Sequence, residues 1–236
     1  MTASVYRELD ESKIIEGLTA LRDRIDNQFP ESGLGRVADE MIAVGSEVTA
    51  CADYLNSPNW PIRIVAGSLI AGMIAVLYFA SPPLDVPTGA HKFSGVQSIA
   101  AGLNIVAIVS VAALFLLQLE TNLKRRRAHA VIHELRSLAH VVDMHQLSKD
   151  PSGRRFPEPE ITESPKGAMS PPSLGRYLDY CVDLLSLNGK LSALLVQRFN
   201  DDQVLSEVND IEALTTGLST RIWQKIQLLE TGTHNN

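Results

Sequence analysis

The chain has 236 residues, a hydrophobic fraction of 45% and a formal net charge of −6. An acidic average argues against a general nucleic-acid-binding protein, because such proteins present a basic face to the phosphate backbone. The two cysteines, Cys51 and Cys181, form no Cys-x-x-Cys pair and lie far apart. They therefore argue against a zinc site, dithiol redox chemistry and a structural disulfide.

Residues 1–60 are expected to form two helices that belong to a cytoplasmic N-terminal segment. Apolar residues recur there at spacings of three and four, the period of one helix face. They are Ile14, Leu18, Leu21 and Ile25 in the first helix, and Val37, Met41, Val44, Val48 and Leu55 in the second. Pro30, Gly33 and Gly35 predict a break between the two helices.

Two long apolar stretches, residues 62–80 and 96–119, occupy the middle of the chain. Apart from Arg63 near the start of the first, neither contains Asp, Glu, Lys or Arg. At 1.5 Å per residue, each is long enough as a helix to cross a hydrocarbon core of about 30 Å. Residues 61–119 are therefore predicted to be a transmembrane helical hairpin, with residues 81–95 as a short external loop.

The basic residues predict the orientation of this hairpin, since Lys and Arg accumulate on the cytoplasmic side of a membrane. Arg63 precedes the first span and the loop holds a single Lys92. The run that follows the second span is Lys124, Arg125, Arg126 and Arg127. Both termini are therefore predicted to lie in the cytoplasm, with the hairpin in the inner (plasma) membrane. The basic run is also a candidate site for anionic lipid headgroups.

Small residues and one amide suggest where helices pack inside the bilayer. Gly67, Ala71 and Ala75 recur every fourth position in the first span, and Asn104 and Ala107 share a side of the second. Small residues let helices approach closely, and an intramembrane amide seeks a hydrogen bond from a neighbour. Packing within the hairpin, packing between subunits and the lining of a pore all remain open. At the cytoplasmic side, Arg63 and Glu120 lie at matching depths and could pair.

The second span is predicted to continue as a long helix through residues 120–148, because residues 96–147 contain no proline. One side of this extension is apolar: Ala128, Val131, Leu135, Leu138 and Val142. The N-terminal helices or a second subunit are expected to cover it.

The opposite side of the extension carries a histidine stripe, defined here as His129, His133, Arg136, His140 and Asp143. On a helix at 100° per residue these side chains fall within an arc of about 80°. His129 and His133 have the four-residue spacing that lets two imidazoles share a metal ion, with His140 and Asp143 as further ligands. Arg136 would repel a cation, however, and His133 and His140 are almost two turns apart. A solvated or interhelical polar stripe is the alternative, and we expect no metal or other cofactor.

Arg127 and His133 have a further spacing of interest. It is similar to that of HEPN-type helical ribonucleases, which carry an arginine followed after four to six residues by a histidine. That resemblance implies a nuclease. On a regular helix, however, these two side chains point in different directions.

Residues 149–172 hold half of the chain's prolines and are predicted to be a linker. Residues 173–230 are predicted to form a C-terminal helical hairpin, with Ser173 as a helix cap and a turn at Asn200 and Asp201. The apolar stripe of its first helix is Leu174, Leu178, Cys181, Leu185, Leu191, Leu195 and Phe199. That of its second helix is Val204, Val208, Ile211, Leu214, Leu218, Ile222, Ile226 and Leu229. The fold expected for the whole chain is all-α: a transmembrane hairpin joined to a cytoplasmic, coiled-coil-like helical bundle.

Two resemblances add expectations about function. Over residues 36–148, the order of a helix, two spans with a short loop and a long basic helix resembles the SLATT type of two-span effector of bacterial conflict systems. This resemblance implies a pore-forming or membrane-perturbing module. Residues 133–140 (HELRSLAH), 143–147 (DMHQL) and 175–180 (GRYLDY) are similar to segments of uncharacterised bacterial inner-membrane proteins, which implies a bacterial inner membrane and no particular activity.

Three functions from different classes are consistent with these features. The favoured one is a non-enzymatic membrane scaffold or accessory subunit, whose partners are the lipid bilayer, further copies of the chain or a soluble cytoplasmic protein, and not nucleic acid. The second is a pore-forming effector. The third is a metal-dependent or HEPN-like nuclease centred on the histidine stripe. No phosphate loop, nucleophile elbow or complete metalloprotease motif supports an enzyme.

Overall fold

The computed structural model describes residues 8–80, 92–147 and 169–234, and within them every regular element is an α-helix. In chain order the helices are α1 (Glu11–Gln28), α2 (Gly33–Asn56), α3 (Trp60–Ala80), α4 (Lys92–Leu147), α5 (Pro171–Arg198) and α6 (Asp202–His234). The all-α prediction is confirmed for the described residues, which contain no strand. The chain separates into two compact units, a bundle unit of residues 1–56 and 125–236 and a hairpin unit of residues 57–124.

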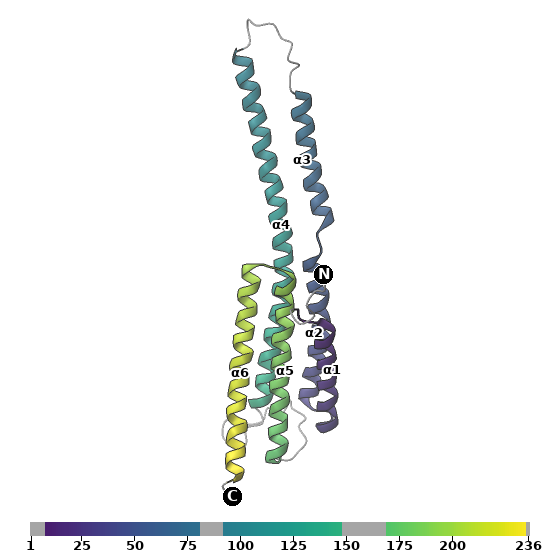
Figure 1. Ribbon diagram of the computed structural model, residues 1–236, viewed down its shortest axis with the longest axis vertical. Coiled ribbons are helices and arrows are strands. Elements are labelled where there is room, and N and C mark those ends of the chain that lie inside the picture. Colours follow the sequence, from purple (N-terminus) through teal and green to yellow (C-terminus); the bar gives the residue numbers. More distant parts are fainter. Residues whose placement is uncertain (1–7, 81–91, 148–168, 235–236) are drawn as a thin grey trace. The chain divides into compact units, whose positions relative to one another are not determined.

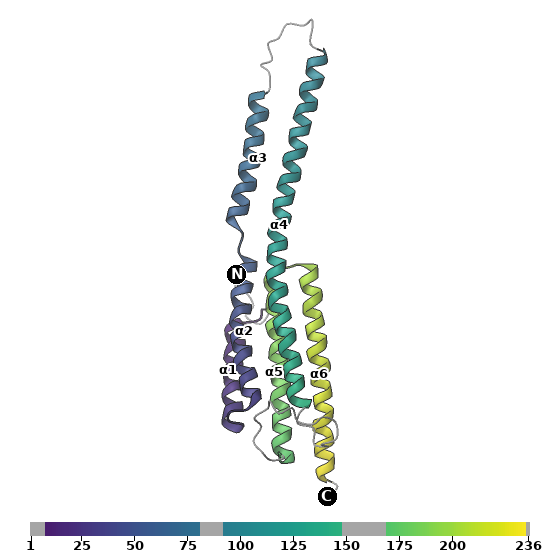
Figure 2. The same ribbon diagram turned by 180° about the vertical axis from the view of Figure 1, so that it is seen from behind.

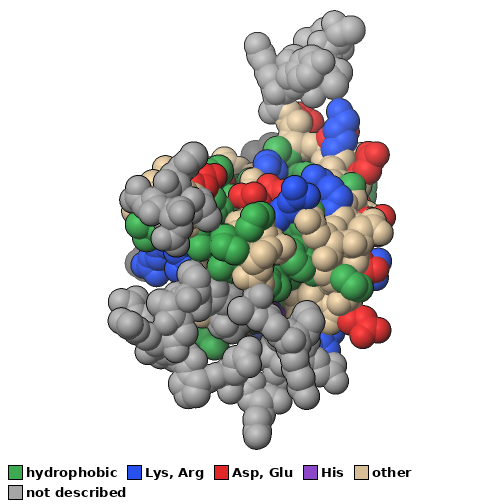
Figure 3. Space-filling view, turned by 90° about the horizontal axis from the view of Figure 1, so that it is seen from below, with side chains coloured by type: hydrophobic (Ala, Val, Ile, Leu, Met, Phe, Trp, Pro, Cys, Tyr) green, Lys and Arg blue, Asp and Glu red, His purple; other side chains and the backbone are tan. Residues whose placement is uncertain are grey.

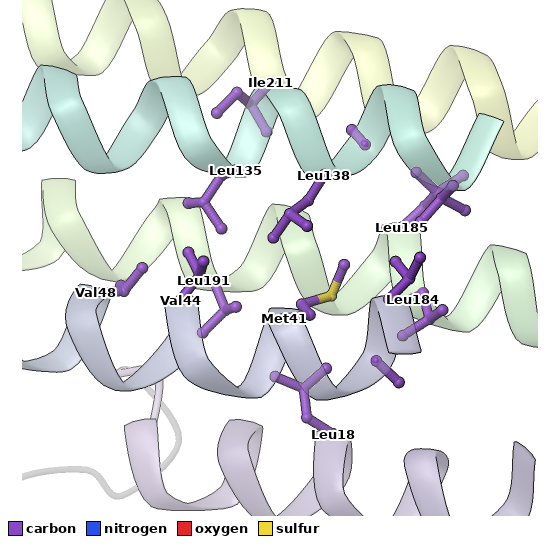
Figure 4. Close-up of a cluster of buried hydrophobic side chains, with 14 of the residues drawn as sticks. Leu18, Met41, Val44, Val48, Leu135, Leu138, Leu184, Leu185, Leu191 and Ile211 are labelled. Atoms are coloured by element: carbon purple, nitrogen blue, oxygen red, sulfur yellow. The ribbon is translucent and has the colours of Figure 1, made fainter. Parts of the chain in front are cut away.

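The bundle unit is built from α1, α2, the C-terminal part of α4, α5 and α6. Helix α5 lies among the others and contacts α1, α2 and α6 (Figures 1 and 2). Leu18 of α1, Met41 of α2, Leu135 of α4, Leu185 of α5 and Ile211 of α6 belong to one buried cluster (Figure 4). Each helix therefore turns its apolar side toward a common core, as amphipathic helices do.

The buried residues follow the periodicity of the sequence closely. The apolar faces predicted for the two N-terminal helices and for the extension of the second span are buried throughout. In the C-terminal hairpin only Phe199, Leu214 and Leu229 are partly buried rather than buried. Apolar residues spaced three and four apart were sufficient to predict the buried positions, because a helix presents one face to its neighbours along its whole length.

Three predicted boundaries differ from the structure. Gly33 and Gly35 both belong to α2 and not to the break, and the Ser32 hydroxyl accepts a hydrogen bond from the Gly35 N–H at 3.2 Å at the start of this helix. Helix α5 begins at Pro171 with Ser170 as its N-cap, so Ser173 lies in the first turn. Proline suits this position because its fixed φ and missing N–H cost nothing in the first turn of a helix.

The third difference concerns the external loop. Most of residues 81–95 and of the linker 149–172 lie outside the described residues, but residues 92–95 belong to α4. Gly95 does not interrupt the helix, since a single glycine costs only about 1 kcal/mol there. Helix α4 then continues without a break to Leu147 and supplies residues to both units.

Candidate functional site: the apolar hairpin and its charged base

The hairpin unit exposes large apolar side chains along both of its helices. On α3, Ile64 is 63% exposed and Ile74 is 59% exposed. On α4, Ile108 is 69% exposed and Leu114 and Phe115 are each 66% exposed. Soluble proteins rarely leave so continuous an apolar surface in contact with water. Two helices are long and apolar enough to cross a membrane, by length and composition, and almost none of their most apolar windows is buried.

Aromatic side chains stand at the two ends of α3. Trp60 at its start is 67% exposed, and Tyr78 near its end is 75% exposed. Rings with an apolar body and a polar edge prefer the two interfaces of a bilayer. Their separation of 18 residues corresponds to about 27 Å along a helix, which is close to the thickness of a hydrocarbon core.

A charged base, defined as Ser57, Asn59, Arg63, Glu120 and Lys124, closes one end of the hairpin unit. Glu120 is 6% exposed and accepts a hydrogen bond from the backbone N–H of Asn59 at 3.2 Å. Its carboxylate lies 3.6 Å from Nε of Arg63 and 3.4 Å from Nζ of Lys124. The pairing of Arg63 with Glu120, which their matching depths allowed, is thus present. Lys124 also donates to the carbonyl of Ser57 at 2.8 Å, which ties the segment before α3 to α4.

The four residues of the basic run have different surroundings. Lys124 is buried in the charged base, and Arg125 donates hydrogen bonds from Nε and Nη2 to the Asp201 carboxylate. The guanidinium of Arg127 lies 4.8 Å from the centroid of the Tyr54 ring. Arg126 is exposed. Three of the four cations assigned to lipid headgroups by the sequence therefore contact groups of the protein itself.

The histidine stripe lies partly against α6 and partly in solvent. His129 Nδ1 pairs with Oε2 of Glu207, and Arg136 Nη2 lies 3.8 Å from Oδ2 of Asp210. His133 and His140 are exposed. Asp143 accepts a hydrogen bond from Gln146 Nε2 at 2.6 Å.

This arrangement separates the proposed metal ligands. Among the described residues, no group of three or more His, Cys, Asp or Glu side chains is placed to hold a metal ion. The nuclease pair is also separated, because Arg127 stacks on Tyr54 whereas His133 is exposed on the helix surface. On the face seen in Figure 3, acidic and basic side chains are interspersed with apolar ones, as on a solvated protein surface.

The residues expected to pack inside the bilayer are exposed within this single chain. They are Gly67, Ala71, Ala75, Asn104 and Ala107. A Cβ atom added at Gly67 would meet no described atom within 4 Å. The hairpin unit by itself leaves all five available to lipid or to another helix.

Sequence reasoning missed the acidic partners at the start of α6 and within it. Asp201 was recognised only as part of a turn, and Glu207 and Asp210 were not singled out. The position of Asp201 directly before a helical repeat was a usable signal for a capping residue. Its contact with Arg125, 76 positions away, has no local signature.

Comparisons of this chain with models of known protein families, with curated proteins and with solved structures find no match.

Proposed function

We propose that this chain is a two-span inner-membrane protein without catalytic activity, whose cytoplasmic helical bundle serves as an assembly or docking module. One observation carries the proposal: α3 and the N-terminal part of α4 expose an apolar surface, while the other unit of the chain has a buried core of its own. Lipid tails would cover that surface at little cost, because every backbone hydrogen bond of a helix is satisfied internally.

The distribution of charge supports the orientation. In the sequence, Arg63 stands at the start of the first span, and Lys124 and the three arginines after it follow the second span, where the chain enters and leaves the bundle residues. Positive charge accumulates on the cytoplasmic side of a membrane. The absence of catalysis is supported by the polar side chains of the bundle, since several of its prominent charges pair with one another across helices. Such pairs join neighbouring helices, so these charges are engaged with the protein itself.

The test is membrane fractionation combined with labelling of single cysteines. We expect the full-length protein to stay in the membrane pellet after alkaline carbonate washing. An impermeant maleimide should label Thr88→Cys in the predicted external loop on intact cells. It should label Glu47→Cys, at an exposed position of α2, only after the cells are permeabilised. Release by carbonate would contradict the anchor, and labelling of Glu47→Cys on intact cells would contradict the orientation.

A pore-forming effector is the second candidate, and one observation favours it. Asn104 places an exposed amide in the middle of an otherwise apolar stretch, where it would suit a water-filled lumen. Expression should then collapse the membrane potential, and Asn104→Leu should restore it. A normal membrane potential at high expression would contradict this function.

A further inference from the structure

Six side chains on α4 form a row that we call the heptad seam. Their spacings alternate between four and three residues, the repeat that brings two helices together along one face. On a helix at 100° per residue all six fall within an arc of about 80°. They are Asn104, Ile108, Val111, Phe115, Gln118 and Asn122.

The whole seam is exposed in the single chain. Ile108 is 69% exposed, and Val111 and Phe115 are each 66% exposed. Asn104, Gln118 and Asn122 are exposed as well. None of the described residues, including those of α3, covers this face.

Within this row, the side-chain amide of Asn104 needs a hydrogen-bond partner. Its amide has no hydrogen-bond partner among the described residues, although it lies in the apolar stretch. Lipid tails offer no hydrogen bond, so the amide gains from a neighbouring helix that does. Helix α3 contains no Asn or Gln, and the hydroxyl of its Ser68 already donates to the carbonyl of Val65 at 2.8 Å.

We propose that the heptad seam is the contact surface between two copies of this chain, parallel in the membrane and related by a two-fold axis. An amide carries both a donor and an acceptor, so Asn104 of one copy complements Asn104 of the other. The seam carries no charge that would repel its own copy. Asparagine at one position of a heptad also specifies the register of the pair. This inference rests on the proposed membrane anchor.

Disulfide cross-linking in isolated membranes tests the seam. Val111→Cys places a thiol in it, and Leu117→Cys places one on the other side of α4, where Leu117 is 50% exposed. The wild-type chain gives the background, because Cys51 and Cys181 are both buried. We expect oxidation to give a covalent dimer with Val111→Cys and little with Leu117→Cys.

The role of Asn104 is tested in the Val111→Cys background. We expect Asn104→Leu to lower the yield of cross-linked dimer. The substitution should raise the dissociation constant of the dimer about 3- to 30-fold, the range for one intramembrane amide contact. Ser110→Leu is the matched control, since it removes another exposed polar group away from the seam and should have no effect. Tyr78→Phe removes the remaining hydroxyl of α3 and should also leave cross-linking unchanged.

Three outcomes would overturn the seam. They are equal cross-linking at positions 111 and 117, cross-linking that Asn104→Leu leaves unchanged, and a detergent-extracted particle larger than a dimer. Carbonate washing of the same membranes separates the two proposals. A chain that stays in the membrane without cross-linking contradicts the seam alone, whereas a chain that is washed off contradicts the anchor.

Discussion

Nη2 of Arg125 lies 2.7 Å from Oδ2 of Asp201, and Nε of the same guanidinium donates to Oδ1 at 3.1 Å. Oδ1 also accepts hydrogen bonds from the backbone N–H groups of Gln203 and Val204, at 3.1 and 3.2 Å. One carboxylate therefore caps α6 and joins it to α4. An arginine that sequence patterning assigned to lipid headgroups instead holds two helices of the bundle together.

Removing this pair should destabilise the bundle. Arg125→Gln should lower the free energy of unfolding by about 1–3 kcal/mol, because the Asp201 carboxylate, whose side chain is 7% exposed, loses a charged donor. Arg126→Gln, at an exposed position, should change it by less than about 0.5 kcal/mol. Unfolding in detergent followed by circular dichroism measures both. Equal effects of the two substitutions would contradict a stabilising role for the pair of Arg125 and Asp201.

Two substitutions of Asp201 separate its two roles. Asp201→Asn keeps an oxygen that caps α6 but loses the charge that pairs with Arg125. Asp201→Ala loses both and should cost a further 0.5–2 kcal/mol or so, the usual contribution of an N-cap. If the two variants unfolded at the same temperature, the carboxylate would not act as a cap.

The pair should also make stability depend on pH. The hydrogen bond from Arg125, together with the N–H groups of Val204 and Gln203, holds the pKa of Asp201 below its usual value. A lowered pKa in the folded state contributes stability above the unfolded pKa of about 3.9, and this contribution is lost as the pH falls through the folded pKa. The stability difference between wild type and Asp201→Asn should therefore be constant from about pH 5 to 8 and shrink below about pH 4. A stability difference that persisted undiminished at pH 3 would show that it does not come from the charge on the Asp201 carboxylate.

Asn188 is a buried polar residue whose replacement should be tolerated. Its Nδ2 donates to the carbonyl of Leu135 at 2.9 Å, while Oδ1 is buried without a partner among the described residues. Asn188→Leu removes the unsatisfied oxygen at similar volume, so the free energy of unfolding should fall by less than about 1 kcal/mol or should rise. Asn188→Asp would bury a carboxyl group and should be strongly destabilising at pH 7. A large loss on Asn188→Leu would show that the amide is needed for packing.

Glu120 should control the local opening of the chain before α3. Glu120→Leu removes the acceptor of the Asn59 N–H and leaves the buried Lys124 without its carboxylate partner. Loss of such a hydrogen bond is worth about 1 kcal/mol or more, so the Asn59 amide should exchange with solvent roughly tenfold faster. Hydrogen exchange measured by mass spectrometry on residues 57–63 reads this out. Thr121→Val is the control, because the Thr121 hydroxyl donates only to Leu117 within its own helix. Similar rates in both variants would contradict the role of the charged base.

The two cysteines should be protected as long as the bundle is folded. Burial raises the pKa of Cys181 to about 12 and also raises that of Cys51. Because the thiolate is the reactive form, neither should react with a maleimide at pH 8 in the native protein. Both should react once the chain is denatured. Rapid labelling of the folded protein, read by intact mass, would show that the bundle opens around α2 or α5.

Sequence alone determined the helical content, the faces that are buried and the two stretches with the length and composition of membrane spans. These properties are local: a helix satisfies its backbone hydrogen bonds within itself, and its apolar period appears directly in the residues. The pairing of Arg63 with Glu120 was also accessible, because counting residues along two antiparallel spans places both at one depth. The helix starts at Gly33 and Pro171 were placed less well, since a helix start depends on one or two residues rather than on a repeat, as with the hydrogen bond from the Gly35 N–H to Ser32.

Only the tertiary structure decided which groups meet across helices. The sequence assigned Arg125 to lipid headgroups and His129 to a candidate metal site, and it left the role of Arg136 open. In the structure these three residues meet Asp201, Glu207 and Asp210, which lie at the start of α6 or within it. The difference has a physical cause. Whether a charge faces solvent or another helix depends on the rotation and register of packed helices, which are set by how side chains throughout the core interdigitate.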